Sequence, residues 1–326
     1  MFLSRREAHR SLRSATPLTR TIRFIAGLLL GLALTLALAG CADSRAAFSE
    51  STEVTTLRVV ATFSVLGDLV QRVGGEKIDL RVLVGRGGDP HDFRPLPADQ
   101  AAVAEADLVF AIGPGYEVWL DRLLASSGTT ARTIHVSSGL DPLLTDSGDP
   151  DPHVWHDVGQ AIHIVGSVRQ ALAAAHPADA TGFDERAARM IAELTTLDDW
   201  IVAQMASIPT DRRRLAVNHD SFGHLARRYG LEMVGAIVPA LAGEAVAPSA
   251  ETLAGLVDRA RESGVVAIFA EKGTNSQLAA QLAHEAGVPL IDGLYSDTLG
   301  PAGGEAETYP GMIRANIGVL VAGLAP

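Results

Sequence analysis

Cysteine is almost absent from this chain of 326 residues, which contains only Cys41. No disulfide can therefore form within the chain, and its stability has to come from an ordinary hydrophobic core. Basic residues are also scarce, since 27 lysines and arginines stand against 38 aspartates and glutamates. This acidic balance argues against nucleic-acid binding, which requires a basic surface, so we expect no nucleic-acid partner.

Nucleotide-binding and catalytic motifs are missing as well. The glycine-rich segments 85–88 and 113–115 match neither GxGxxG after a first strand nor GxxxxGK[ST], so we expect no nucleotide cofactor. No HExxH sequence occurs, and no glutamate is placed as an obvious general base. We therefore expect no catalytic residues and no enzyme activity. A zinc-dependent hydrolase with an open coordination position is the rival interpretation.

The first 40 residues have the order of a secretory signal. A segment with six arginines precedes an apolar run over 24–39, which is short for a transmembrane helix. The small residues Ala39 and Gly40 directly ahead of Cys41 match a lipobox. This pattern predicts that residues 1–40 are a lipoprotein signal peptide and that Cys41 is lipidated. A plain N-terminal membrane anchor with an incidental cysteine is the alternative.

Residues 41–56 are small and polar, which predicts a flexible tether. Residues 1–40 hold six arginines and one glutamate, so 21 basic and 37 acidic residues remain without them, a net charge of −16. Such a charge is compatible with a cation as ligand. We expect a protein outside the cytoplasm, held by its lipid either in a periplasm or on the outer face of the cell membrane.

From Leu57 onward, short apolar strands alternate with helical stretches. LRVVATF, IDLRVLVG and DLVFAIG have the pattern of strands, and the segments after them, including EVWLDRLLASS over 117–127, that of helices. The alternation predicts βα units around a mainly parallel sheet. Strands return at RLAVNH, LEMVGAIV, VVAIFAE and VPLIDGL. We therefore expect one α/β lobe over 57–177 and a second over 209–326.

The segment 178–208 between the lobes interrupts the alternation of short strands and helices. It has no glycine after Gly182 and no proline before Pro209, and its apolar residues follow a helical spacing. One helix of roughly 25 residues would be ~37 Å long. The fold class predicted is α/β, with two Rossmann-like lobes joined by one long backbone helix.

Four side chains stand where a strand runs out into a loop: His91, His153, His219 and Asp297. Ligands of open α/β sheets bind outside the carboxyl ends of the strands, so these residues, two from each lobe, can converge on the cleft between the lobes. Three imidazoles and one carboxylate fill a tetrahedral zinc shell and leave no position for an activated water. Four unrelated loop residues are the alternative. Two of the histidines, His91 and His153, each end an Asp-Pro-His tripeptide. This repetition favours a shared site, because proline fixes the backbone just ahead of the histidine.

The chain resembles a known family in four segments that occur in the family's order. GGDPHDFRPLPADQAAVAEADLVFAIGPGYEVWL is similar to the first-ligand loop of the cluster A-I metal-binding proteins of ABC importers, which bind zinc or manganese. DPHVWHDVGQA, VNHDSFGHLARRYGL and LYSDTLG resemble the segments with the second, third and fourth ligands. The resemblance runs from about Leu57 to Leu324. It implies two α/β lobes joined by one long helix, in agreement with the alternation above.

The resemblance carries the ligand roles onto His91, His153, His219 and Asp297. It implies an extracytoplasmic solute-binding protein, expected as a monomer, that delivers a divalent metal to a membrane permease and its ATPase. Family members with histidine at the third position tend to bind zinc and those with glutamate manganese, so His219 favours Zn²⁺. The long histidine-rich loop of many zinc-specific members is absent here, which leaves Mn²⁺ as the alternative. Neutral imidazoles bind metal, so affinity should fall as the pH drops toward ~6.

Several neighbours of the four residues can be interpreted in two ways. Trp155 either walls the site or is a core residue below it, and Asn218 and Asp220 are candidates to orient His219. The remaining histidines of the mature chain are expected not to bind metal: His135, His156, His163, His176, His224 and His284. Two further rivals stay open, a two-lobed receptor for a larger ligand such as a metal chelate, and an adhesin that only retains the fold.

Overall fold

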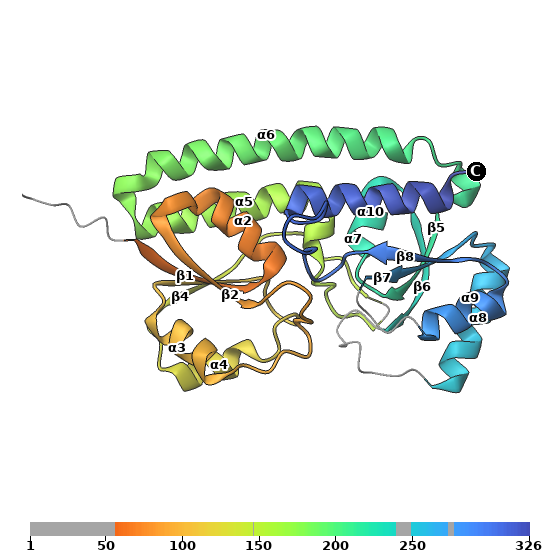
Figure 1. Ribbon diagram of the computed structural model, residues 1–326, viewed down its shortest axis with the longest axis horizontal. Helices are drawn as coiled ribbons and strands as arrows, with labels where there is room; N and C mark the ends of the chain where they lie inside the picture. Colours follow the sequence, from red (N-terminus) through yellow and green to blue (C-terminus); the bar gives the residue numbers. More distant parts are fainter. Residues whose placement is uncertain (1–55, 146, 239–248, 273–276) are drawn as a thin grey trace, which may run out of the picture. The chain divides into compact units, whose positions relative to one another are not determined.

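The computed structural model describes residues 56–145, 147–238, 249–272 and 277–326, and the unit that begins at Thr56 is shown in Figure 1. The predicted signal peptide, Cys41 and nearly all of the tether lie outside the described residues. No helix in the described ranges is both long and apolar enough to cross a membrane.

The first lobe is built on a four-stranded parallel sheet in the order β2-β1-β3-β4. Its strands are β1 (Leu57–Phe63), β2 (Ile78–Val84), β3 (Leu108–Ala111) and β4 (Arg132–His135). Its helices are α2 (Ser64–Gly74), α3 (Pro97–Glu105), α4 (Leu120–Ser127) and α5 (Val158–Ala175). In Figure 1, α3 and α4 lie on the opposite side of this sheet from α2 and α5.

The second lobe repeats the arrangement with a parallel sheet in the order β6-β5-β7-β8. Its strands are β5 (Arg214–His219), β6 (Glu232–Val238), β7 (Ile268–Glu271) and β8 (Leu290–Leu294). Its helices are α7 (Gly223–Tyr229), α8 (Ala250–Ser263), α9 (Gln277–Ala286) and α10 (Tyr309–Leu324).

Helix α6 (Ala180–Met205) runs along both lobes, above α5 and α10 in the view of Figure 1. Its 26 residues give a length of about 39 Å. Every third or fourth residue is buried, which places one apolar face on the molecule: Phe183, Ala187, Met190, Leu194, Leu197, Ile201 and Met205. This face belongs to the larger hydrophobic core, which also takes in Leu215 and Val217 of β5 and much of α10. The larger core therefore extends through both lobes, a second and smaller core lies within the second lobe, and the predicted fold is confirmed.

One predicted helix is shorter than expected. The segment 117–127 is helical only from Leu120, because the Glu117 side chain turns inward and bonds to the first sheet. Its buried carboxylate accepts hydrogen bonds from Thr62 Oγ1 at 2.7 Å and from the backbone N–H of Ile112 at 2.8 Å. The side chain thus fastens the ends of β1 and β3 together, and burial raises its pKa to about 7.

Candidate metal centre

The structure brings the four predicted side chains together. One ligand atom from each of His91, His153, His219 and Asp297 lies within 4.8 Å of all the others. All four residues are buried, with exposed fractions of 8%, 0%, 1% and 9%. His91 follows β2, His219 ends β5 and Asp297 follows β8, so these three sit at the carboxyl ends of parallel strands.

The repeated Asp-Pro-His tripeptide has one local geometry in both places. The Asp89 Oδ1 accepts the backbone N–H of His91 at 2.8 Å, and the Asp151 Oδ1 accepts that of His153 at 3.0 Å. An aspartate that bonds the backbone two residues ahead forms a tight turn, and the intervening proline stiffens it. The turn fixes the direction in which each histidine leaves the chain.

The His153 ring is oriented by Asp151. Its Nδ1 lies 2.8 Å from Asp151 Oδ1, and since a carboxylate only accepts, the ring hydrogen is on Nδ1. The lone pair of Nε2 is then directed at the site, 3.4 Å from His91 Nε2 and 3.5 Å from Asp297 Oδ1. A carboxylate behind the ring raises the basicity of a metal-binding imidazole. His224 donates from Nε2 to the backbone oxygen of Asp151 at 3.0 Å, so it holds the backbone of the residue that orients His153.

The separations between donor atoms fit a tetrahedral cation. Bonds of 2.0–2.2 Å to nitrogen and oxygen place neighbouring donors of a tetrahedron about 3.3–3.6 Å apart. His219 Nδ1 lies 3.4 Å from Asp297 Oδ2, and His91 Nε2 lies 3.7 Å from the same oxygen. These values, and the 3.5 Å between His153 Nε2 and the other Asp297 oxygen, are close to the spacing of donors around one metal ion.

A fifth polar side chain, Glu271, lies beside the site. It ends β7, is buried, and its Oε1 is 3.4 Å from His219 Nδ1. Ser296 Oγ donates to its other oxygen, and Ser221 Oγ donates to Oε1 at 3.4 Å. Glu271 is not among the residues predicted from the sequence, although it stands at the end of the strand VVAIFAE. The rule that selected His219 from its strand end also points to Glu271.

The loop that carries Asp297 is attached to the first lobe. Thr298 Oγ1 accepts the backbone N–H of Gly87 at 2.6 Å, and Ser64 Oγ accepts that of Leu299 at 3.0 Å. The Tyr116 hydroxyl donates to Asp297 Oδ1 at 3.3 Å. Asp297 thus follows a strand of the second sheet, as expected, and its carboxylate lies between Tyr116 of the first lobe and His219 of the second.

Burial shifts the pKa values of the side chains at the site. Removal from water lowers the pKa of His91 to about 3, with the nearby His153 and His219 acting in the same direction, and it lowers that of His153 well below its usual value. Burial also raises the pKa of Asp297 to about 7. The low pKa values keep His91 and His153 neutral at physiological pH, and a neutral imidazole can bind a cation.

The other residues considered from the sequence have mainly structural surroundings. Trp155 is fully buried, packs on the His153 ring at 5.3 Å between centroids, and donates from Nε1 to the Ser296 backbone oxygen at 3.0 Å. It is therefore both a core residue and a wall of the site. His156 is buried between the rings of Trp155 and Phe222. Asn218 Oδ1 accepts the backbone N–H of Glu271 at 3.0 Å.

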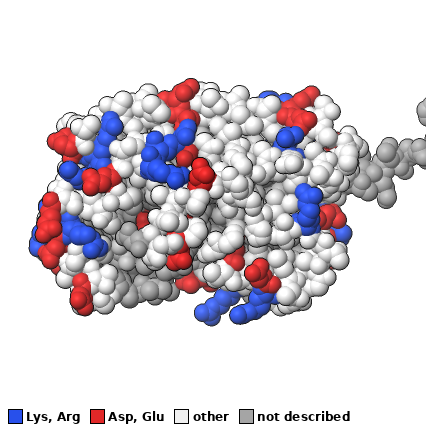
Figure 2. Space-filling view, turned by 180° about the vertical axis from the view of Figure 1, so that it is seen from behind, with Lys and Arg blue, Asp and Glu red and all other residues white. Residues whose placement is uncertain are grey.

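The face of the molecule in Figure 2 shows lysine and arginine side chains interspersed with aspartates and glutamates. No broad basic surface covers this face, in keeping with the acidic composition. Such a mixed surface does not provide the stripe of positive charge that nucleic-acid binding needs.

Comparisons with known proteins agree on one family. A family model described as zinc-uptake complex component A, periplasmic, matches residues 59–323. The chain is 30% identical over 293 residues to the manganese-binding lipoprotein MntA of Halalkalibacterium halodurans, covering 90% of this chain and 96% of that protein. It is 26% identical over 298 residues to the manganese ABC transporter substrate-binding lipoprotein PsaA of Streptococcus pneumoniae serotype 4, covering 88% and 94%.

A solved structure gives the same result for the fold. The periplasmic zinc-binding protein TroA from Treponema pallidum is similar with a TM-score of 0.77 and 28% sequence identity, covering 82% of this chain and 99% of that one. PsaA is named as the substrate-binding lipoprotein of a transporter and MntA as a metal-binding lipoprotein, and this agrees with the expectation that the chain is not an enzyme. The chain belongs to the zinc-uptake component A family, the metal-binding solute-binding proteins of ABC importers.

Proposed function

We propose that this protein captures a divalent transition metal between its lobes and delivers it to an ABC permease, with zinc as the preferred cargo. The proposed ligands are His91, His153, His219 and Asp297, and the observation that carries the proposal is the convergence of their donor atoms within 4.8 Å. Three imidazoles and one carboxylate suit the borderline-soft Zn²⁺. The proposed signal peptide 1–40, the lipid on Cys41 and the tether 41–56 would hold a monomer at the membrane surface.

Manganese is the second candidate, and the names of the relatives support it at least as well as zinc. The relatives MntA and PsaA are both named for manganese. Glu271 adds to the chemical argument, because a second carboxylate beside the site supplies the hard oxygen that Mn²⁺ prefers. The site therefore has a donor set for zinc and a neighbouring group that favours manganese.

The direct test is to identify the metal. Residues 42–326, purified without chelator, are analysed by elemental mass spectrometry and then titrated with zinc and manganese in competition. We expect about one zinc per chain that manganese does not displace. One manganese per chain would keep the transport function and reverse the metal assignment. Failure to retain or bind either metal would contradict the proposed function.

Metal affinity is expected to depend on pH through Asp297 more than through the histidines. The pKa of Asp297 is about 7, so below that pH a proton occupies the carboxyl and competes with the metal. Zinc affinity should rise with pH up to about 7 and fall about tenfold per unit below it. His91, with a pKa of about 3, adds to the fall only in stronger acid.

The measurement is a zinc titration between pH 5 and 8, with calorimetry in buffers of different ionisation enthalpy to count the protons released. An Asp297→Asn variant binds more weakly at every pH but should lose the slope between pH 5 and 7, because its amide does not titrate there. An affinity that is constant over this range in the parent protein would contradict the role of Asp297.

A further inference from the structure

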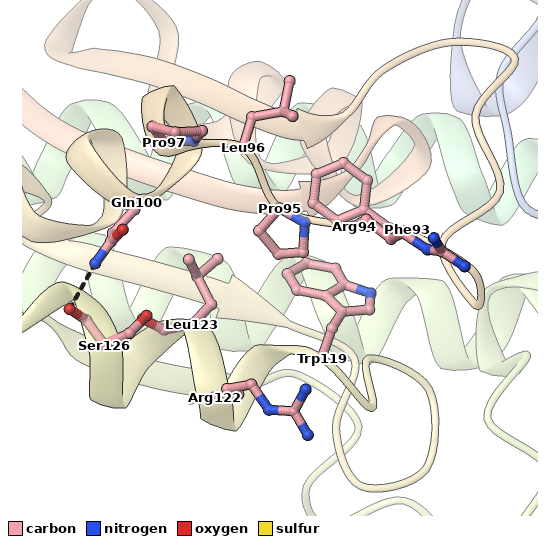
Figure 3. A pocket seen from close by; sticks show the side chains of 10 residues that line it. All are labelled: Phe93, Arg94, Pro95, Leu96, Pro97, Gln100, Trp119, Arg122, Leu123 and Ser126. Atoms are coloured by element: carbon pink, nitrogen blue, oxygen red, sulfur yellow. Dashed lines mark hydrogen bonds between the residues drawn. The ribbon is translucent and has the colours of Figure 1, made fainter.

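A pocket separate from the metal centre opens on the first lobe. It has a volume of ≈ 400 Å³ and lies between the loop after His91 and the helices α3 and α4 (Figure 3). Its floor and walls are aromatic and aliphatic, and two guanidinium groups stand at its edge: Phe93, Arg94, Leu96, Trp119, Arg122 and Leu123. Gln100 Nε2 donates to the Ser126 backbone oxygen at 2.6 Å and ties α3 to α4 at one end of the pocket.

The two arginines give this pocket a charge opposite to that of the protein. Arg94 and Arg122 are exposed, and within the described part of the chain neither has an ion-pair partner. An unpaired guanidinium presents a planar fork of N–H donors that fits a carboxylate. The chain without its predicted signal peptide has a net charge of −16, but these two arginines make the edge of the pocket positive. The pocket can therefore bind an anionic group.

One residue that lines the pocket and one that is next to a lining residue in the sequence are large, apolar and exposed. Leu96 is 64% exposed, and Val118, which precedes Trp119 in the chain, is 71% exposed. Both are among the large hydrophobic residues most exposed to solvent in the described part of the chain. Aromatic and arginine side chains around an apolar centre are the composition of energetically dominant contacts between proteins.

The pocket is connected to the first proposed metal ligand. The Trp119 indole Nε1 donates to the Pro90 backbone oxygen at 2.7 Å, and Pro90 directly precedes His91. On the other side of His91, the Phe93 ring packs edge-on against Trp119 with 4.8 Å between centroids. Trp119 therefore holds the backbone on both sides of His91 from inside the pocket.

We propose that this pocket receives the extracytoplasmic surface of the importer's membrane subunit, through a segment with a carboxylate beside a large apolar side chain. The proposal rests on the function proposed above, because a solute-binding protein of an ABC importer has to contact the permease. Two separate arginines over an aromatic floor fit a single anchored carboxylate better than a membrane surface, which attracts clusters of basic residues. A segment in the pocket touches Trp119, and movement of Trp119 shifts the turn that presents His91.

The test is a double charge reversal, Arg94→Glu with Arg122→Glu, in the full lipidated protein. The control reverses Arg132 and Arg189, two exposed arginines outside the pocket, for the same change in net charge. ATP hydrolysis by the permease–ATPase complex of the same cell, reconstituted in liposomes, is measured against the concentration of metal-loaded protein. We expect the half-maximal concentration to rise by more than about tenfold for the pocket variant and to change little for the control.

Metal titration separates this result from the proposed function. Zinc affinity of the pocket variant should stay within about twofold of the parent, because neither arginine contacts the metal centre. An unchanged half-maximal concentration would overturn the docking proposal, and so would an equal loss in the control. A loss of binding to anionic liposomes that lack the permease would also overturn it, in favour of a membrane contact. Absence of metal binding in the parent would contradict the proposed function and the docking proposal together, whereas an unchanged half-maximal concentration in a parent that binds metal would contradict the docking proposal alone.

A second variant tests the connection to His91. Trp119→Phe keeps an aromatic ring in the pocket and removes the N–H that Pro90 accepts. Zinc should leave this variant about three- to tenfold faster than the parent in a chelator-chase experiment, since a net hydrogen bond contributes on the order of 1 kcal/mol. An unchanged rate of zinc release would show that the pocket does not act on His91.

Discussion

Replacing His219 with alanine is expected to weaken zinc binding by more than about 100-fold, the largest effect of any single change proposed for this protein. The substitution removes one of four proposed donors, and alanine offers no atom that could replace it. The remaining cavity admits water, but a water molecule is a weaker donor than a fixed imidazole. The measurement is the competitive zinc titration used for the parent protein.

His284→Ala is the matched control, because His284 is an exposed histidine in α9 of the same lobe. Its zinc affinity should equal that of the parent. His219→Glu should in addition move the ratio of zinc to manganese affinity toward manganese, since a carboxylate is the harder donor. Unchanged zinc affinity in His219→Ala would contradict the assignment of this residue as a ligand.

Glu271→Gln is expected to weaken metal binding by about 10- to 100-fold, with manganese affected more than zinc. The substitution keeps the size of the side chain and its acceptor for Ser221 or Ser296, but it removes the negative charge 3.4 Å from His219 Nδ1. The loss of a nearby anion disfavours a bound cation of either kind. The affinity for manganese should fall more than that for zinc, because manganese depends more strongly on oxygen donors.

Glu262→Gln provides the control, since Glu262 is an exposed residue of α8 with the same chemistry. Thermal unfolding of each metal-free variant distinguishes a loss of binding from a loss of folding. Equal affinities of Glu271→Gln and the parent for both metals would show that Glu271 serves only to fasten Ser221 and Ser296.

The parts of the fold that follow from local pattern could be predicted from the sequence. Helix α6 was predictable because an uninterrupted helical spacing of apolar residues depends only on near neighbours in the chain. The convergence of His91, His153, His219 and Asp297 was predictable from the rule that parallel strands end at one edge, together with the resemblance to a known family. Their role as ligands remains a prediction.

The features of the fold that could not be predicted from the sequence depend on contacts between distant segments. The sequence cannot show that Glu117 turns inward to accept the N–H of Ile112 and so delays the start of α4. It also gives no sign that the Asp297 loop bonds to Ser64, which is 235 residues from Leu299. Hydrogen bonds of this kind depend on the tertiary structure, and the spacing of apolar residues along the sequence does not reveal them.

The attachment of residues 298–300 to the first lobe has a consequence for the order of ligand exchange. We infer that a tilt of the second lobe would separate His219, which ends β5, from His91, His153 and Asp297, because the residues directly after Asp297 are hydrogen-bonded to the first lobe. The metal then rests on a tripod while a fourth, incoming donor replaces the lost imidazole. In a cobalt-substituted protein the tilted state would keep the absorption of a site with three protein ligands. A spectrum of fully hydrated cobalt would instead mean that the cargo leaves in one step.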